Sequence, residues 1–423
     1  MPLKSIFIKN FRGVSDGIDL PIRPITLFIG ANSSGKSTVI HSLATLSQTV
    51  KLPNDSRPLI LDDEFGSVHL GRFIEVIHSK SYQDCISLGL TLGHEAIAQV
   101  GVDGIKPVDG EIDMRLDFKS TTRTQKVHVD SGTLKIGNET CQFKMKRDKS
   151  TKGKPVVPEY DVNWMGKACV AQMTNGFALE ETSFFTAQVD DLKAWIAVIM
   201  AQKSINQQLE RTYYLGPFRQ PPVRQYPTRG ASPIEVGAQG EATATLLANE
   251  VMRSHNRTHI NEISKWLNIM GIGKRLNISR IAASDMFGVE VSLPDEKTFA
   301  LADLGYGVSQ ALPVLTQCSF AADGSILLFE QPELHLHSLA IRPLATVFID
   351  AMRKKKLTIL AETHAIELVG EFQRQLRAGT IKLEEIIVYR VTRQDGHTVI
   401  KPIEIEKDDF DIYELWKKGI SED

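Results

Sequence analysis

Residues 25–38 read Ile-Thr-Leu-Phe-Ile-Gly-Ala-Asn-Ser-Ser-Gly-Lys-Ser-Thr, and this stretch decides the fold. Five mostly β-forming apolar residues lead into Gly30, and Gly30–Ser37 match the phosphate-binding pattern G-x-x-x-x-G-K-[ST]. Apolar residues at helical spacing follow between Thr38 and Leu46. Because a strand, a glycine loop and a helix are the context that the pattern requires, we favour a nucleotide site over a chance glycine-rich turn.

The residue types in this loop suit a bound phosphate chain. Glycines allow the backbone to wrap a phosphate closely, and successive N–H groups and the helix N-terminus point at the anion. Lys36 would add a positive charge at the β- and γ-phosphates, and the Ser37 hydroxyl would ligate Mg²⁺. The sequence therefore predicts nucleotide and magnesium binding.

Composition restricts the other classes of function. The chain has 423 residues, enough for two or three domains, and a formal net charge of −2, so no overall basic field favours nucleic acid. Four scattered cysteines, without a C-x-x-C pair, indicate reduced thiols in a cytosolic protein. The N-terminus alternates like a strand, and no apolar run approaches the ~20 residues that span a bilayer. We expect a soluble cytoplasmic protein with no membrane partner.

The rest of the N-terminal half of the chain, on both sides of the loop, is rich in strand signals. Residues 3–9 predict a strand, and the turn that follows contains Arg12. From Cys85 to Arg147 short runs alternate between apolar and polar residues, which is typical of an antiparallel sheet. Residues 187–211 have helical periodicity. The basic stretch Lys144–Lys154 is interpreted as a solvated loop in preference to a nucleic-acid contact.

The second half carries three further signals in order. Residues 301–310 predict a Gly-x-Gly turn that opens a helix over Val308–Ala321. Its N-terminus is a candidate second anion site, with an ordinary glycine turn before a helix as the alternative. Residues 325–330 are a continuous apolar run that ends in Glu330, as expected for a buried parallel strand with a carboxylate at the ligand edge. A second buried strand ends at His364, a candidate γ-phosphate sensor.

The last residues predict a hairpin and a short tail. Ile386–Val391 and Thr398–Ile405 flank an Asp-Gly turn, the strongest short-range hairpin signal. An acidic and aromatic segment follows at 408–416, for which packing on its own domain is favoured over a docking role.

Four motifs occur in this order: the phosphate loop, the Gly-x-Gly turn, the strand that ends in Glu330 and the Glu-Thr-His sequence that ends in His364. With the Asn-Phe-Arg-Gly turn that precedes them, they resemble the ABC-type ATPases of the SMC, RecF and OLD group, most closely the arm-less prokaryotic relatives found in anti-phage defence systems. The resemblance covers about residues 1–50 and 213–405. It implies an α/β P-loop NTPase fold: a two-lobed ABC-type ATPase head with a mixed sheet flanked by helices and an inserted β-rich and helical subdomain. The implied domains are the N-terminal part of the head at 1–50, the insertion at 51–212 and the C-terminal part of the head at 213–423.

The resemblance also assigns site residues. It implies ATP and Mg²⁺ as cofactors, with Ser37 and Glu330 at the metal, and His364 as the switch histidine. Arg12 would be directed toward the nucleotide, and the signature loop would face the nucleotide of a second subunit, so that two chains enclose two nucleotides. The cofactor-binding positions would be Arg12, Gly30, Asn32, Ser34, Gly35, Lys36, Ser37, Thr38, Gly305, Gly307 and Ser309.

One position departs from the family pattern. Hydrolytic members have a glutamate after the metal-site acid, where this chain has Gln331. An amide can orient water but cannot accept a proton at neutral pH. Either Glu333 or another acid serves as the base, or hydrolysis is slow and the ATP-bound dimer is long-lived; the second is favoured. His335 and His337 could form a metal cluster with Glu333, but a subunit-contact loop is the preferred interpretation.

Three functions remain open at this point. The favoured one is an ATP-gated sensor and scaffold that controls a separate toxin or nuclease effector in anti-phage defence, because fewer than sixty residues follow His364 and no nuclease motif is present. Nucleic acid or a phage protein would be its trigger. The alternative is a RecF- or SMC-like DNA repair or recombination ATPase, for which Lys144–Lys154 is the only support. A transporter subunit ranks last because the usual Ser-Gly-Gly signature is missing.

Overall fold

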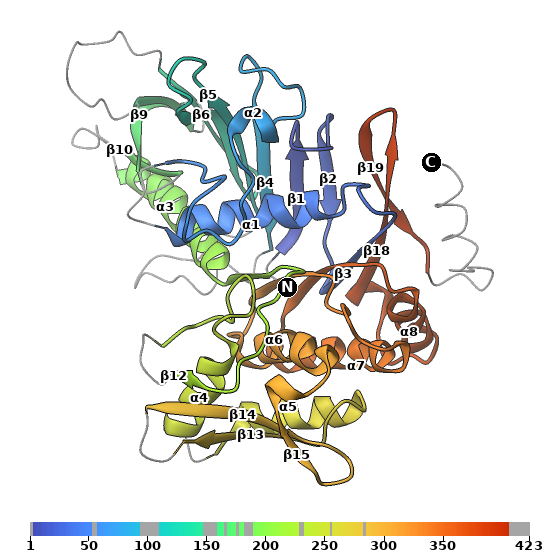
Figure 1. Cartoon of the computed structure of the whole chain (residues 1–423). Coiled ribbons are helices and arrows are strands. Elements are labelled where there is room, and N and C mark those ends of the chain that lie inside the picture. The colour runs from blue at the N-terminus through green and yellow to red at the C-terminus, as the bar shows by residue number, and fades with distance from the viewer. Residues whose placement is uncertain are drawn as a thin grey trace. The chain divides into compact units, whose positions relative to one another are not determined.

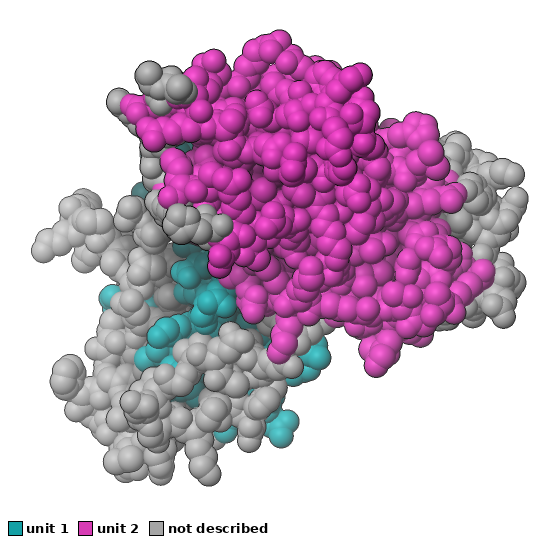
Figure 2. Space-filling model, turned by 90° about the horizontal axis from the view of Figure 1, so that it is seen from below, with its two compact units in different colours: residues 1–22, 41–212, 393–399 teal, residues 23–40, 213–392, 400–423 magenta. Residues whose placement is uncertain are grey.

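The computed structural model describes most of the chain, which divides into two compact units. Unit 1 comprises residues 1–22, 41–212 and 393–399, and unit 2 comprises residues 23–40, 213–392 and 400–423, as coloured in Figure 2. The described residues are 3–52, 57–93, 110–146, 159–164, 167–174, 177–181, 189–227, 232–253, 256–281 and 285–405. Most of the basic stretch predicted at 144–154 and all of the acidic tail at 408–416 lie outside them.

Unit 1 is built on a nine-stranded sheet in which the order is β10-β9-β8-β7-β6-β5-β4-β1-β2 and every neighbouring pair is antiparallel. The alternation expected from the sequence is clear in β5, where every second residue is buried. The predicted strand at 3–9 joins this sheet through β4. The strands are β1 (Leu3–Lys9), β2 (Ile18–Pro21), β4 (Ile86–Leu92), β5 (Ile112–Ser120), β6 (Val127–Ile136), β7 (Glu139–Met145), β8 (Glu159–Trp164), β9 (Lys167–Thr174) and β10 (Ala178–Glu181).

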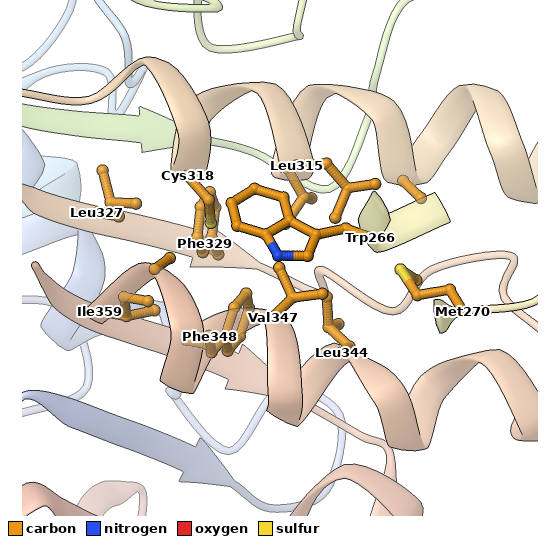
Figure 3. Close-up of a cluster of buried hydrophobic side chains, with 14 of the residues drawn as sticks. Trp266, Met270, Leu315, Cys318, Leu327, Phe329, Leu344, Val347, Phe348 and Ile359 are labelled. Atoms are coloured by element: carbon orange, nitrogen blue, oxygen red, sulfur yellow. The ribbon is translucent and has the colours of Figure 1, made fainter. Parts of the chain in front are cut away.

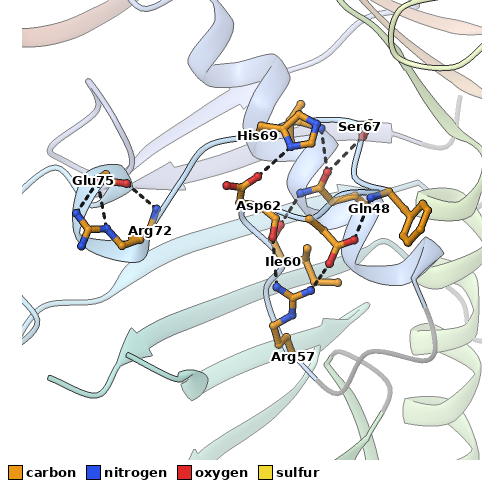
Figure 4. A network of polar contacts seen from close by, with 11 residues as sticks. Gln48, Arg57, Ile60, Asp62, Ser67, His69, Arg72 and Glu75 are labelled. Carbon is orange, nitrogen blue, oxygen red and sulfur yellow. Dashed lines mark hydrogen bonds and ion pairs between the residues drawn. The ribbon is translucent and has the colours of Figure 1, made fainter. Parts of the chain in front are cut away.

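Helices α1 (Ser37–Lys51), α2 (Phe73–Val76) and α3 (Val189–Glu210) complete unit 1, to which α1 contributes the part after Ile40. Gln48 of α1 is buried, and its amide organises the segment that follows the helix (Figure 4). Its Nε2 donates to the Ile60 carbonyl at 2.6 Å, and its Oε1 accepts from the Val68 N–H at 3.0 Å. The buried amide is thereby satisfied on both sides, which avoids the cost of an unpaired polar group.

Unit 2 contains a six-stranded sheet with the order β11-β16-β17-β3-β18-β19. The pairs β16–β17, β17–β3 and β3–β18 are parallel, and every residue of β16, β17 and β3 is buried. Continuous apolar runs such as these are expected of strands covered on both faces. The strands are β3 (Ile25–Ile29), β11 (Thr212–Leu215), β16 (Ile326–Glu330), β17 (Thr358–Thr363), β18 (Ile386–Gln394) and β19 (His397–Ile403).

The predicted C-terminal hairpin is confirmed. β18 and β19 are joined by Asp395 and Gly396, which have φ values of 49° and 82°. Positive φ at both central residues is the signature of the tight turn that matches strand twist, and an Asp-Gly pair suits it.

The described part of unit 2 also contains α-helices α4 to α8 and a small sheet (Figure 1). Helices α6 and α7 pack against β16 and β17, and α5 packs on α6. The helices are α4 (Thr243–Arg253), α5 (Thr258–Ile269), α6 (Tyr306–Phe320), α7 (Ser338–Lys355) and α8 (Ile366–Arg377). The small antiparallel sheet has the order β12-β14-β13, with β15 also on β14: β12 (Tyr226–Pro227), β13 (Arg275–Arg280), β14 (Met286–Ser292) and β15 (Thr298–Ala300).

The core of unit 2 lies between the sheet and these helices (Figure 3). Trp266 of α5 is 1% exposed, and its indole N–H donates to Asp350 Oδ2 at 2.9 Å, so that its polar atom is satisfied. Phe329 of β16 stacks on Phe348 of α7 with ring centroids 5.7 Å apart. This packing fixes β16, and with it the position of Glu330 at the end of the strand.

Candidate nucleotide site

The phosphate-loop residues form the predicted connection between β3 and α1. Gly30 is required by close packing, because a Cβ atom there would lie 2.1 Å from the Val391 carbonyl oxygen. Gly35 has a φ of 99°, which a residue with a side chain rarely adopts. Lys36 is 3% exposed, and its ammonium group donates to the carbonyls of Ala31 at 2.7 Å and Gly30 at 3.1 Å. The cation is therefore held over the loop by the loop's own backbone.

Three further loop residues occupy different environments. Asn32 is exposed, whereas Ser34 and Thr38 are buried. The Thr38 N–H donates to the Gly35 carbonyl at 3.0 Å, where α1 begins. The concave backbone and the free start of a helix are the features that bind phosphate groups.

Glu362 is the acidic residue in direct contact with this loop. It lies on β17, which pairs with the phosphate-loop strand β3. The Ser37 hydroxyl donates to Glu362 Oε2 at 2.6 Å, and Lys36 Nζ lies 3.8 Å from Glu362 Oε1. Glu362 would therefore lie beside any Mg²⁺ ion that the Ser37 hydroxyl ligated.

Glu330 lies beside Glu362. The two residues are register partners at the carboxyl ends of β16 and β17. Glu330 is 6% exposed and accepts a hydrogen bond from the Tyr214 hydroxyl at 2.9 Å. The carboxyl ends of parallel strands are where α/β sheets bind ligands, so the two acids lie at the edge that the fold uses for chemistry.

Burial dominates the electrostatics of the site. Burial lowers the pKa of Lys36, although Glu362, Glu333 and Glu330 oppose that change. Burial raises the pKa of Glu362, which the Ser37 hydrogen bond opposes. The site thus holds one partly desolvated cation and three carboxyl groups. The cation would attract a phosphate chain, and the carboxyl groups would attract a divalent metal ion.

The Glu333 carboxylate contacts the backbone of His364. The His364 N–H donates to Glu333 Oε1 at 2.9 Å, and burial raises the pKa of Glu333. Burial and, secondarily, the charge of Lys36 lower the pKa of His364 to about 4. His364 is therefore neutral at physiological pH, and one ring nitrogen can accept a hydrogen bond while the other donates.

Gln331 occupies a constrained turn directly after Glu330. Its φ is 46°, in the left-handed region, and its N–H donates to the Glu362 carbonyl at 2.8 Å. Its own carbonyl accepts from Arg219 Nη2 at 2.9 Å. The backbone at the expected position of the general base is thus fixed on both sides.

Gly305, Gly307 and Ser309 mark the start of α6, which begins at Tyr306, two residues before the predicted start. Gly305 is the residue that precedes the helix, and Gly307 lies in its first turn. The Ser309 hydroxyl is buried against the Tyr306 carbonyl, to which it donates at 3.0 Å. The predicted signature residues therefore share one helix terminus.

Arg12 belongs to unit 1, in the turn after β1. Its guanidinium contacts His41 Nδ1, and its N–H donates to the Val76 carbonyl at 2.7 Å. Contact with a nucleotide remains a prediction for this residue.

His335 and His337 have structural partners. The ring of His335 lies 5.8 Å from that of Tyr306, and His337 Nδ1 caps α7 by accepting from the Leu339 N–H at 3.3 Å. Among the residues that the structure describes, no group of three or more histidine, cysteine or acidic side chains is arranged to hold a metal.

Glu362, Tyr214 and Arg219 are the site residues that sequence reasoning missed. Glu362 was within reach, because the Glu-Thr-His end of its strand places an acid at the same sheet edge as Glu330. Arg219 and Tyr214 carry no motif that would have separated them from ordinary turn and strand residues.

Two family models match parts of the chain. Residues 1–152 match a family model described as "AAA ATPase domain", and residues 190–370 match one described as "AAA domain, putative AbiEii toxin, Type IV TA system". A search of curated proteins finds no match.

The fold is also found among solved structures. An SMC head bound to the C-terminal winged-helix domain of ScpA has a TM-score of 0.50 at 10% identity, over 96% of this chain and 98% of that one. The Smc head domain with a coiled coil and joint from Pyrococcus yayanosii has a TM-score of 0.49 at 9% identity, over 99% and 100%.

The chain is therefore similar to AAA ATPase domains in two of its parts, and its fold is that of SMC head domains. The fold class expected from the sequence, a P-loop α/β head with a mixed sheet flanked by helices, is confirmed. None of the described helices has the length and hydrophobicity needed to cross a membrane.

Proposed function

We propose that this ATPase is an ATP-gated switch that closes as a dimer and hydrolyses ATP slowly. The observation that carries the proposal is the contact of Lys36 and Ser37 with Glu362, which is the register partner of Glu330. These residues fit ATP and Mg²⁺: the loop would hold the phosphates, while Ser37, Glu330 and Glu362 would surround the metal. Bound Mg²⁺ would neutralise charge that develops on the phosphates.

Slow turnover follows from the groups near the expected base. The Gln331 amide can orient a water molecule but cannot take its proton. Glu333 offers a carboxylate two residues on, but one of its oxygens accepts from the His364 N–H and its side chain is buried. Glu333 is therefore the alternative base, but burial and the hydrogen bond from His364 constrain its carboxylate. This supports slow hydrolysis and a long-lived ATP-bound state.

The start of α6 supports closure on a second copy of the chain. Gly305 has an ordinary φ of −59°, and nothing lies within 4 Å of the position that its Cβ would take. The fold of the single chain therefore does not require glycine there, whereas close approach of another molecule would. Tyr306 and Leu339 are 64% and 73% exposed, and large exposed apolar side chains suit an interface.

We further propose that the switch controls a separate effector, a toxin or a nuclease, in defence against phage. The support is the family model for residues 190–370, whose description refers to a toxin of a toxin–antitoxin system. A neutral His364 beside the phosphate loop would let the chain sense the γ-phosphate, and so signal whether ATP is bound.

Sedimentation velocity tests the switch. Wild-type protein should change from monomer to dimer with ATP and Mg²⁺, and Lys36→Ala should remain monomeric while the exposed control Lys135→Ala behaves as wild type. A wild-type chain whose oligomeric state does not change with ATP would refute the switch.

Other experiments test the effector and the alternative function. Co-purification with the product of an adjacent gene would support the effector, whereas full phage resistance in Lys36→Ala cells would exclude it. Salt-sensitive DNA binding that changes with ATP would instead favour a repair ATPase.

A further inference from the structure

Phe218 and Arg219 are neighbours with unusual exposure: the apolar side chain is exposed to solvent and the charged side chain is buried. Phe218 is 84% exposed, whereas Arg219 is 7% exposed. Arginine is almost never buried without a partner that balances its charge, and an exposed phenylalanine beside it adds no core packing. This inversion suggests that the arginine is buried for a purpose other than stability.

The buried guanidinium binds three backbone carbonyls on two separate parts of the nucleotide site. Nη1 donates to Gln310 on α6 at 3.0 Å, and Nη2 donates to Gln331 at 2.9 Å and to Glu330 at 3.2 Å. Its Nε has no hydrogen-bond partner among the described residues. A buried cation that is held by carbonyl dipoles and leaves one donor unsatisfied is an expensive way to join two elements.

The loop that carries Arg219 is stiff. Pro217, Pro221 and Pro222 restrict its backbone, and the Gln220 N–H donates to the Gln239 carbonyl at 2.9 Å. The guanidinium therefore has a fixed origin, and a displacement of α6 would be opposed or transmitted at Gln331 and Glu330.

We infer that Arg219 is a positioning residue that couples the start of α6 to the backbone of Gln331. The inference deepens the proposed function, on which it rests for its catalytic consequence. When a second chain engages Gly305 and Gly307, the displacement of α6 reaches Gln331 through one rigid side chain. The left-handed conformation of Gln331 is held by this contact on one side and by the Glu362 carbonyl on the other.

Hydrogen exchange tests the physical link without any ATPase measurement. In Arg219→Met, amides of 310–315 and 331–336 should exchange about tenfold faster, because both segments lose a shared anchor, while residues 36–40 keep their rates. The matched control is Arg224→Met, which removes an exposed arginine that pairs with Asp303 at 2.6 Å. It should leave both segments unchanged. Unchanged exchange at 331–336 in folded Arg219→Met would overturn the inference.

Kinetics test the catalytic consequence. Arg219→Met should keep the Kd for ATP with Mg²⁺ within about threefold of wild type and lower kcat about tenfold. It should also abolish any gain in rate produced by Gln331→Glu, since coupled residues are not additive. A merely structural role would lower kcat and affinity together and leave that gain intact, which would contradict the inference.

A conservative variant covers the case in which Arg219→Met does not fold. Arg219→Lys keeps the positive charge but lacks the planar guanidinium with its two terminal N–H groups. Lysine should therefore protect only one of the segments 310–315 and 331–336 from exchange, and not both. Equal, wild-type exchange in both segments of Arg219→Lys would overturn the inference. If wild-type protein neither binds nor hydrolyses ATP, the proposed function fails, and the exchange data alone decide on the link.

Discussion

The Ser37 hydroxyl donates a 2.6 Å hydrogen bond to Glu362 Oε2, and this contact joins the phosphate loop to the strand beside it. Sequence reasoning placed the metal-site acid at Glu330, which lies on β16. The strand order puts β17 between β16 and the phosphate-loop strand, so Glu362 is one strand nearer to Ser37 than Glu330 is. The two acids together offer more oxygen ligands to Mg²⁺ than either alone.

Removal of the Glu362 charge should weaken magnesium-dependent nucleotide binding. We expect Glu362→Gln to raise the Kd for ATP with Mg²⁺ about tenfold, because a charged ligand near the cation is lost, and to change the Kd without Mg²⁺ far less. Isothermal titration with and without Mg²⁺ measures both values. The exposed Glu384→Gln serves as the control. An equal effect with and without the metal would show that Glu362 acts on the loop and not on the cation.

A carboxylate at position 331 should accelerate hydrolysis. General-base catalysis contributes about 10²–10⁴-fold, so Gln331→Glu is expected to raise kcat by at least about tenfold if the backbone at 331 is correctly placed. Single-turnover and steady-state rates of phosphate release provide the measurement. No gain in rate would sink the idea that Gln331 limits catalysis, and would leave Glu333 as the base.

His364 should make the fold sensitive to acid. In the unfolded chain a histidine takes up a proton near pH 6.5, whereas in the folded chain its pKa is about 4. Between these values the unfolded state binds more protons, so the free energy of unfolding falls as the pH falls from about 6.5 to 4. The raised pKa values of Glu333 and Glu362 act in the opposite direction.

The comparison with His364→Gln separates these contributions. Urea unfolding of wild type and His364→Gln at several pH values should show a larger loss of stability for wild type across that window. Parallel pH profiles for the two proteins would contradict the lowered pKa of His364.

Two glycines should respond differently to alanine. Gly30→Ala places a methyl group 2.1 Å from the Val391 carbonyl oxygen, so the loop must shift and ATP binding should fall about tenfold or more. Gly305→Ala meets open space at an ordinary φ, so stability and nucleotide affinity of the monomer should be kept. If α6 faces a second chain, Gly305→Ala should still weaken ATP-dependent dimerisation. Normal dimerisation of Gly305→Ala would argue against that interface.

Local sequence patterns were enough to predict much of the secondary structure around the candidate nucleotide site. The phosphate loop, the two apolar strands that end at Glu330 and directly before His364, and the Asp-Gly hairpin each depend on neighbouring residues, so the sequence displays them directly. Long-range pairing is different: β1 pairs with β4 across about eighty residues, and no periodicity reveals that partner. The sequence could place Glu362 at the same sheet edge as Glu330, but only the strand order shows that Glu362 adjoins Ser37.

Burial of charge was equally hidden. Arg219 lies two residues after Pro217 and two residues before Pro221, a context typical of an exposed turn, yet the fold buries it. The start of α6 was placed late because glycines were interpreted as a turn, whereas Gly307 lies inside the helix.

The most direct test of the account is the affinity of the purified chain for ATP with Mg²⁺, measured for wild type, Lys36→Ala and the surface control Lys135→Ala. The geometry at Lys36, Ser37, Glu330 and Glu362 predicts saturable binding of ATP to wild type and to Lys135→Ala. It predicts a loss of about 100-fold or more in Lys36→Ala, because this variant lacks the buried cation that would hold the phosphates. Equal affinity of all three proteins, or no binding by the wild type, would contradict the account.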